Sequence, residues 1–260
     1  MPSAHTEPSG SGAEPFDPAH RLLGGPPLWA TLPDERRRPI GLDTVLGALK
    51  AAGQLGPAPD GPPAPPGDSL APWRRLLPAG ASTDDASAAA VLVALFEEGG
   101  EARVVLTRRS AELRTHRGQV SFPGGRMDEG EDASGAALRE AREEIGLDPG
   151  AVRVVAWLHP LFTLNATSFV LPVVGVLGER PSLVANPDEV ARVFDVALAD
   201  LVDEGAFREE TWDPYESFST AGPQARRIWF FDVADERVWG ATARILHELA
   251  LLTLGIPIGD

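Results

Sequence analysis

Hydrophobic and polar positions along the chain form short apolar runs separated by turn residues, mainly after position 83. The longest run, Ala88–Phe96, predicts a buried strand. The turn Glu97–Gly100 then leads back into a second strand at Arg103–Thr107. Because strands outnumber helices and arrive in runs, the pattern favours a mixed sheet covered by helices over a strict β-α-β alternation. Further strands are predicted at Gln119–Phe122, Val152–Leu158, Phe169–Leu177, Val190–Val196, Phe207–Thr211 and Arg227–Phe231.

A helix is predicted between a polar start at Asp132 or Ser134, either of which can cap it, and a stop at Gly146. Its apolar residues form one stripe, made of Ala137, Leu138, Ala141 and Ile145. The same periodicity predicts helices at Asp43–Ala52, Leu198–Glu204 and Ala241–Leu254.

The first third of the chain shows a different pattern. Residues 1–39 are rich in Pro, Gly, Ser and Ala and have no sustained apolar period, so we expect much of this segment to be disordered or loosely attached. Gly56–Pro72 is Pro-rich and predicts an extended linker. The chain is therefore expected to comprise an irregular Pro/Gly-rich N-terminal extension, residues 1–82, and one globular domain, residues 83–260.

Composition excludes several classes of function. The chain contains no cysteine, so disulfides and thiolate metal sites are ruled out. A formal net charge of −15 argues against general binding to nucleic acid, which needs a basic face. No apolar run is long enough for a membrane helix, and no secretory signal is visible at the N-terminus, so a cytoplasmic protein without membrane contact is expected.

Three glutamates of the predicted helix, Glu140, Glu143 and Glu144, are spaced to gather on the side opposite its apolar stripe. Their mutual repulsion, and their position near the helix C-terminus, are both locally unfavourable. A hard divalent cation such as Mg²⁺ or Mn²⁺, which prefers oxygen ligands, would explain the cluster. A solvated acidic helix face is the alternative interpretation.

The spacing around these glutamates resembles the Nudix box, the signature of hydrolases that cleave nucleoside diphosphates linked to another moiety. The pattern is Gly-x5-Glu-x7-Arg-Glu-(apolar)-x-Glu-Glu-x-Gly-(apolar), and Ala141 is smaller than the aliphatic residue usual in the family. The resemblance covers about residues 83–254 and implies an α/β fold, an α-β-α sandwich around a mixed sheet. The fixed positions are Gly125, Glu131, Arg139, Glu140, Glu143, Glu144 and Gly146.

A second motif precedes the box. Leu106–Gly125 reads Leu-Thr-x-Arg-Ser-x3-Arg-x3-Gly-x3-Phe-Pro-Gly-Gly and resembles the coenzyme A pyrophosphohydrolase branch of the Nudix family, with Val105 in place of a second leucine. Coenzyme A carries a diphosphate and a separate 3′-phosphate, and guanidinium groups suit phosphate oxygens. The candidate substrate-binding residues of this segment are Arg109, Arg114, His116 and Arg117, and Arg108 lies beside them.

The resemblance implies metal-dependent hydrolysis of coenzyme A or acyl-CoA to 3′,5′-ADP and 4′-phosphopantetheine or its acylated form. Glu140, Glu143, Glu144 and the Gly125 carbonyl would hold Mg²⁺ or Mn²⁺. Arg139 would orient neighbouring glutamates, for example through an ion pair with Glu131. The general base is left open between the three box glutamates and Glu189, a candidate carboxylate outside the helix.

Two alternatives stay open. The first keeps the enzyme class and changes the substrate to ADP-ribose, NADH or a nucleoside triphosphate. The second is a non-catalytic Nudix-fold binding or regulatory protein, for which loss of box carboxylates would be expected, whereas all are present. The partner is expected to be a small molecule. A homodimer is an option that the sequence does not decide.

Overall fold

The computed structural model describes residues 21–54, 87–113, 117–163, 168–212 and 226–258. The remaining residues, which include Arg114, His116 and the predicted linker at Gly56–Pro72, lie outside the described ranges. The expected boundary between residues 82 and 83 falls among them, so the division into an extension and a domain stays a prediction.

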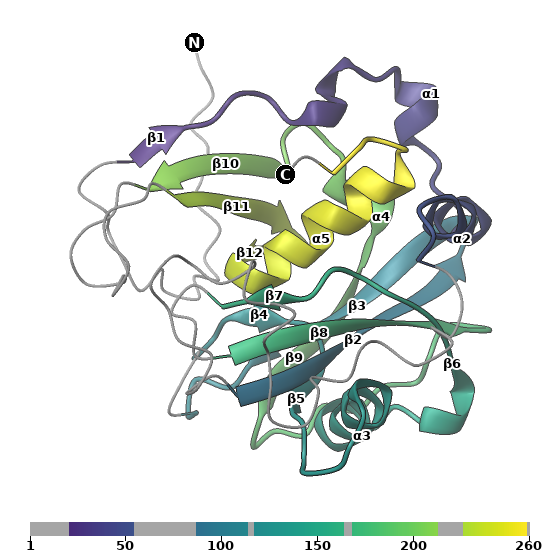
Figure 1. Ribbon diagram of the computed structural model, residues 1–260, viewed down its shortest axis with the longest axis vertical. Helices are drawn as coiled ribbons and strands as arrows, with labels where there is room; N and C mark the ends of the chain where they lie inside the picture. Colours follow the sequence, from purple (N-terminus) through teal and green to yellow (C-terminus); the bar gives the residue numbers. More distant parts are fainter. Residues whose placement is uncertain (1–20, 55–86, 114–116, 164–167, 213–225, 259–260) are drawn as a thin grey trace.

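A mixed eight-stranded sheet forms the centre of the molecule, as the runs of apolar residues predicted (Figure 1). Its strand β2 (Ser87–Glu98) pairs in parallel with β8 (Ser168–Leu177) and in antiparallel fashion with β3 (Glu101–Arg109). The order along the sheet is β4-β3-β2-β8-β6, with β9 on β3, β5 on β2 and β7 on β8. The remaining strands are β4 (Val120–Ser121), β5 (Gly124–Arg126), β6 (Val152–Trp157), β7 (Leu161–Phe162) and β9 (Val190–Ala197).

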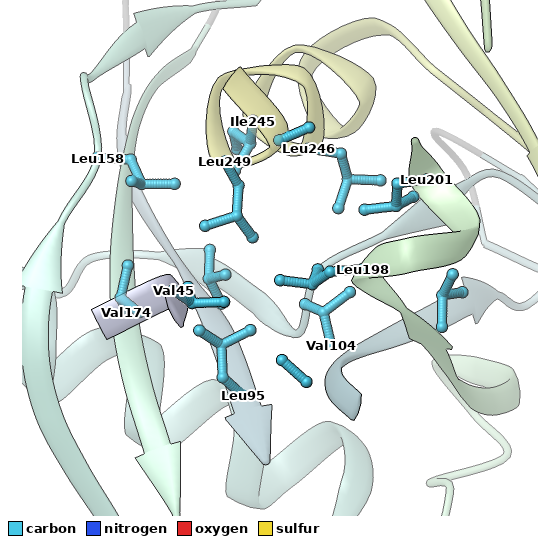
Figure 2. Packing of buried hydrophobic residues seen from close by; sticks show 14 of the residues in the cluster. Val45, Leu95, Val104, Leu158, Val174, Leu198, Leu201, Ile245, Leu246 and Leu249 are labelled. Atoms are coloured by element: carbon cyan, nitrogen blue, oxygen red, sulfur yellow. The ribbon is translucent and has the colours of Figure 1, made fainter. Parts of the chain in front are cut away.

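Helices cover both faces of this sheet. Successive side chains of β2 point to opposite faces, so alternate residues of this strand pack in different apolar clusters. Ala90, Leu92 and Ala94 pack in one apolar cluster with α3 (Ala133–Ile145). Val93 and Leu95 pack in the other. That second cluster includes residues of α2 (Leu42–Ala51), α4 (Leu198–Leu201) and α5 (Gly240–Thr253), and Figure 2 shows part of it, with Ile245, Leu246 and Leu249 of α5 above Leu95 and Val104. The α-β-α arrangement that the sequence predicted is confirmed.

A second, four-stranded sheet lies beside α5 and has the order β1-β10-β11-β12 (Figure 1). The sequence predicted strands at the positions of β10 (Phe207–Trp212) and β11 (Arg226–Val233), and the two pair in antiparallel register. It missed β1 (Arg21–Leu23) and β12 (Glu236–Trp239), which are too short to show a period. The turn into β12 consists of Ala234 and Asp235, both at positive φ, and this pair lacks the glycine of the usual hairpin signal.

Residues 21–39, the described part of the segment 1–39, pack into the same core, although much of that segment was expected to be disordered or loosely attached. Trp29 of η1 (Leu28–Thr31) is fully buried, and Ile40 is 2% exposed. Val45 and Leu49 of α2 are fully buried in the cluster that contains α5. The burial of Trp29 and Ile40 could not be predicted, because isolated apolar residues show no period. The short helix α1 (Asp34–Arg37) lies between η1 and α2 in the chain. Within the described residues, no helix has the length and apolar character to cross a membrane.

Candidate active site

Helix α3 begins and ends where its capping residues predicted. The Asp132 carboxylate accepts a hydrogen bond of 2.7 Å from the backbone N–H of Gly135, so Asp132 is the N-cap and Ser134 lies inside the helix. Gly146 closes the helix in the left-handed region, with φ of 65°. The loop that precedes β9 covers this end, because Val184 and Asn186 donate backbone hydrogen bonds to the carbonyls of Ile145 and Glu144.

The glutamates of α3 do not all lie opposite its apolar stripe, which corrects the expected arrangement. Glu143 is exposed, whereas Glu144 is 1% exposed and faces the sheet. The reason is already present in the spacing. Glu144 follows Ala141 by three positions and Ala137 by seven, so it belongs to the buried stripe. Ala137 and Ala141 are fully buried, and Leu138 is only partly buried.

Strand β5 lies so close to β2 at Gly124, and to α3 at Gly125, that glycine is required at both positions. Gly124 donates its backbone N–H to Glu144 Oε2 at 3.1 Å. It has a φ of 153°, and a Cβ there would lie 2.4 Å from the carbonyl oxygen of Ala90. A Cβ on Gly125 would lie 2.4–2.6 Å from the carboxylate atoms of Glu140. Gly124 and Gly125 therefore form a short strand that holds Glu144 and Glu140, two of the box carboxylates, close to the sheet.

Arg139 is the centre of an ionic network on the outer side of α3. Its guanidinium binds Glu131 through two parallel hydrogen bonds of 3.0 and 2.9 Å. Its Nη1 donates to Glu140 Oε1 at 2.9 Å and to Glu143 Oε2 at 3.3 Å. The hydrogen bonds from Arg139 lower the pKa of Glu131 and hold it ionised. Glu131 thus holds the guanidinium in place through Nε and Nη2, while Nη1 contacts the carboxylates of Glu140 and Glu143.

Burial raises the pKa of two box carboxylates. The pKa of Glu144 rises to about 7, chiefly because burial disfavours its charged form, although the Gly124 N–H and Arg109 favour the carboxylate. The pKa of Glu140 is raised for the same main reason. The negative charge of Glu189 contributes to both shifts. The structure therefore gathers negative charge from α3 and from the start of β9 at one place.

Glu189 reaches this place from outside the helix. Its backbone carbonyl accepts a hydrogen bond of 2.8 Å from Ser110, and its own N–H donates to the carbonyl of Asn186. Asn186 in turn is bound through its backbone N–H to the Glu144 carbonyl at 2.8 Å. This chain of backbone contacts ties the segment that carries Glu189 to the end of α3.

The arginines before the box do not all converge on the glutamates. Arg109 Nη1 lies 3.3 Å from Glu144 Oε1. Arg108, which precedes Arg109 in β3, points to the other face of the sheet and pairs with Glu236. Arg117 is exposed and donates to the backbone carbonyl of Leu113. Arg114 and His116 lie outside the described residues. Of the described candidates for substrate binding, only Arg109 contacts the acidic group.

The donor chemistry of this group fits a hard divalent cation. Glu140, Glu143 and Glu144 supply carboxylate oxygens. Burial, and to a smaller extent the charge of neighbouring carboxylates, raises the pKa of Glu140 and Glu144, and a bound cation would favour their ionised forms. Among the described residues, however, no three acidic or histidine side chains already surround a point where a metal would sit. Glu140 and Glu143 instead share Nη1 of Arg139.

Comparison with known proteins places this fold and site in a family. The chain belongs to the Nudix family, because the NUDIX domain matches residues 86–228. It is 40% identical over 177 residues to Nudix hydrolase 22, chloroplastic, of Arabidopsis thaliana, covering 65% of this chain and 56% of the relative. It is 37% identical over 164 residues to a bacterial relative named Uncharacterized Nudix hydrolase NudL, from Escherichia coli K12, covering 63% of this chain and 81% of the relative.

Structural comparison gives a further match. The crystal structure of RenU, a Nudix hydrolase from M. smegmatis, aligns with a TM-score of 0.44 and 21% identity over 67% of this chain and 89% of that chain. The chain spans little more than half the length of the plant relatives, with 56% of one and 59% of another.

Proposed function

We propose that this protein hydrolyses the diphosphate bond of coenzyme A or acyl-CoA, yielding 3′,5′-ADP and 4′-phosphopantetheine or its acylated form. One observation carries the proposal. Glu144 of the Nudix box accepts hydrogen bonds from Arg109 and from Gly124, which lie near the two ends of the motif that resembles the coenzyme A branch. A single buried carboxylate thus joins the substrate motif to the helix of the box.

Glu140, Glu143 and Glu144, with the Gly125 carbonyl, would hold Mg²⁺ or Mn²⁺. When bound, such an ion neutralises phosphate oxygens and lowers the pKa of water. The chain contributes the rigidity of the ligands. Glu144 is held by a backbone N–H and a guanidinium, and Glu140 lies against Gly125. Side chains fixed in this way need little reorganisation when substrate arrives.

Arg139 acts as a positioning residue in this proposal. Its bidentate bond to Glu131 holds the guanidinium in place, and its Nη1 restrains Glu140 and Glu143. A proton leaving the attacking water needs a nearby carboxylate as acceptor. Glu140, Glu143, Glu144 and Glu189 remain the candidates for this base.

Arg109 is the best placed of the described arginines to meet the diphosphate. It lies beside the carboxylate group and is 24% exposed, so it can offer N–H donors to a phosphate while staying close to Glu144. Its ion pair with a mostly buried carboxylate also offsets part of the cost of burying that charge.

The test is a panel of substrates assayed with Mg²⁺ and with Mn²⁺: coenzyme A, dephospho-CoA, ADP-ribose, NADH and a nucleoside triphosphate. Coenzyme A is expected to be the best substrate, and removal of its 3′-phosphate is expected to lower kcat/KM about tenfold or more. Arg109→Gln should lower kcat/KM for coenzyme A by a similar factor, and Arg153→Gln, an exposed arginine on β6, is the control. Preference for ADP-ribose, NADH or a nucleoside triphosphate would keep the Nudix chemistry and refute the coenzyme A assignment. Turnover of none of them would favour a binding protein.

A further inference from the structure

Strand β3 ends in two adjacent arginines that are held on opposite faces of the sheet. Arg109 pairs with Glu144 on the side of α3, and Arg108 pairs with Glu236 of β12 on the side of α5. The pairing register between β3 and β9 shifts between these two arginines. Both glutamate side chains are 2% exposed. The Glu144 side belongs to the site described above, whereas the Glu236 side has no role in it.

A second arginine stands directly beside Arg108. Arg192 of β9 is its cross-strand partner, and the two guanidinium groups donate to the same oxygen, Glu236 Oε1, at 3.2 and 2.9 Å. Arg192 is fixed further by a 3.2 Å hydrogen bond to the Ala234 carbonyl, and its guanidinium carbon lies 4.9 Å from the ring centre of Phe194. Two cations are therefore held side by side in a defined orientation.

The charges of this cluster do not balance. One arginine is enough to neutralise Glu236, and the second adds repulsion between like charges. Glu236 lies deeper than both, with its Oε2 lacking a hydrogen-bond partner among the described residues. The side chains of Arg108 and Arg192 are 35% and 40% exposed. An anion that approaches from solvent would meet guanidinium N–H groups first, with the carboxylate behind them holding both groups in place.

We propose that Arg108 and Arg192 form a binding site for a phosphate monoester group, separate from the site at Glu144. As a substrate subsite, this inference rests on the proposed function, because coenzyme A carries a phosphate monoester remote from its diphosphate. The position suits that role, since Arg108 directly precedes Arg109 in β3, and a ligand that spans the two sites passes the end of this strand. Free inorganic phosphate has the same chemistry and is the other source of the ligand.

Calorimetric titration of the full chain separates these sources with three probes: adenosine 3′,5′-bisphosphate, adenosine 5′-monophosphate and inorganic phosphate. The bisphosphate is expected to bind more tightly than the monophosphate. Arg192→Gln should weaken binding of the bisphosphate about tenfold or more and so remove most of the difference. Arg192→Lys keeps the charge and loses the planar guanidinium, so its affinity for the bisphosphate should fall between those of the wild type and Arg192→Gln. Arg153→Gln is the matched control.

Equal weakening of bisphosphate and monophosphate binding by Arg192→Gln, or no weakening of any probe, would overturn the inference and leave Arg192 as a structural partner of Glu236. Loss of inorganic phosphate binding alone would keep the anion site and refute its role as a substrate subsite. Thermal unfolding of each variant checks that it is folded. If Arg192→Gln is not folded, Arg192→Lys is used for the test in its place. Coenzyme A turnover by the same preparations reports on the proposed function independently of these titrations.

Discussion

Helices α3 and α5 cover opposite faces of one sheet with very different side chains. The buried face of α5 is built from large aliphatic residues, among them Ile245, Leu246 and Leu249. The buried face of α3 consists largely of alanines, and these small side chains leave room for Gly124 and for the buried carboxylate of Glu144. Large residues maximise apolar burial, whereas small ones let polar groups enter the layer between helix and sheet.

Each helix has one buried glutamate, and the partners differ. On α5, Glu248 accepts from the backbone N–H and the ring Nδ1 of His159, at 3.0 and 2.8 Å, and it lies outside the acidic group. On α3, Glu144 is surrounded by further negative charge, from Glu140 and Glu189. We infer that α5 mainly provides stability and that α3 gives up some stability to concentrate charge for chemistry.

The strongest test of this contrast is Glu144→Gln. We expect kcat for coenzyme A to fall at least about a hundredfold, because a proposed metal ligand and the partner of Arg109 are lost. The melting temperature should stay the same or rise, because a group whose pKa is raised to about 7 by burial destabilises the fold when it is ionised. Steady-state kinetics and thermal unfolding measure the two effects. A large drop in stability would mean that Glu144 is primarily structural.

Gly125→Ala should produce the next largest loss of activity. The added methyl group would lie 2.4 Å from the Glu140 carboxyl carbon, so the carboxylate must move. A displacement of about 1 Å in an active site is enough to lower turnover by about tenfold to a hundredfold. Gly178→Ala, where nothing lies within 4 Å, is the control. Unchanged kinetics in Gly125→Ala would show that the position of Glu140 does not matter for catalysis.

Leu249→Ala, on α5, should have the opposite effect: a loss of stability with little loss of activity. Leu249 is fully buried, so its truncation is expected to lower the free energy of unfolding by about 2–5 kcal/mol. At temperatures well below melting, kcat should stay within about twofold of the wild type, because the helix lies across the sheet from the acidic group. Chemical denaturation and kinetics on one preparation decide this, with Leu252→Ala, which is only partly buried, as the comparison. A selective loss of kcat would show that α5 is coupled to the site.

A pH dependence of stability is expected from His247 of α5. Its ring stacks on Trp229 with 4.9 Å between centres, and burial, with the nearby charge of Arg227, lowers its pKa from 6.5 to about 4. The unfolded chain therefore binds a proton at higher pH than the folded one. Stability from this group is present above about pH 6.5 and is lost progressively as the pH falls towards 4.

Denaturant unfolding of the wild type and of His247→Phe across that pH range measures the effect. The variant preserves an aromatic ring and should lose about 1–2 kcal/mol less stability on acidification than the wild type. Parallel curves for the two proteins would show that His247 is not held neutral in the folded state.

The smallest effect is expected in α2. Gly47 lies inside this helix, and a Cβ there would meet nothing within 4 Å. Gly47→Ala should therefore raise the free energy of unfolding by about 0.5–1 kcal/mol. The gain should appear in the global unfolding transition, because Val45 and Leu49 are buried in the main core. A gain confined to a separate early transition would show that residues 21–54 unfold on their own.

Much of the main sheet and of the two long helices could be predicted, because their residues carry a clear period and α3 also has capping residues at both ends. Asp132 and Gly146 delimit α3 as expected. The pairing of β1 with β10 and the burial of Trp29 could not be predicted, since short or aperiodic segments acquire their structure from contacts distant in sequence.

The residues of the candidate site were proposed from their spacing, and their arrangement was not foreseen. Spacing put Glu140, Glu143 and Glu144 together opposite the apolar stripe, although the distance of Glu144 from Ala141 and Ala137 already placed it in the buried stripe. Glu236 and Arg192 were missed altogether. The two residues are 44 positions apart in the chain, and no local sequence pattern predicts such a contact.

The most direct test of the account is product analysis after incubating the purified protein with coenzyme A and Mg²⁺ or Mn²⁺. We predict equimolar 3′,5′-ADP and 4′-phosphopantetheine from the wild type and from Leu249→Ala, and almost none after addition of EDTA or from Glu144→Gln. Full turnover by Glu144→Gln, or the absence of 3′,5′-ADP from an active wild-type preparation, would contradict the assignment of α3 and the segment before it as the site of coenzyme A hydrolysis.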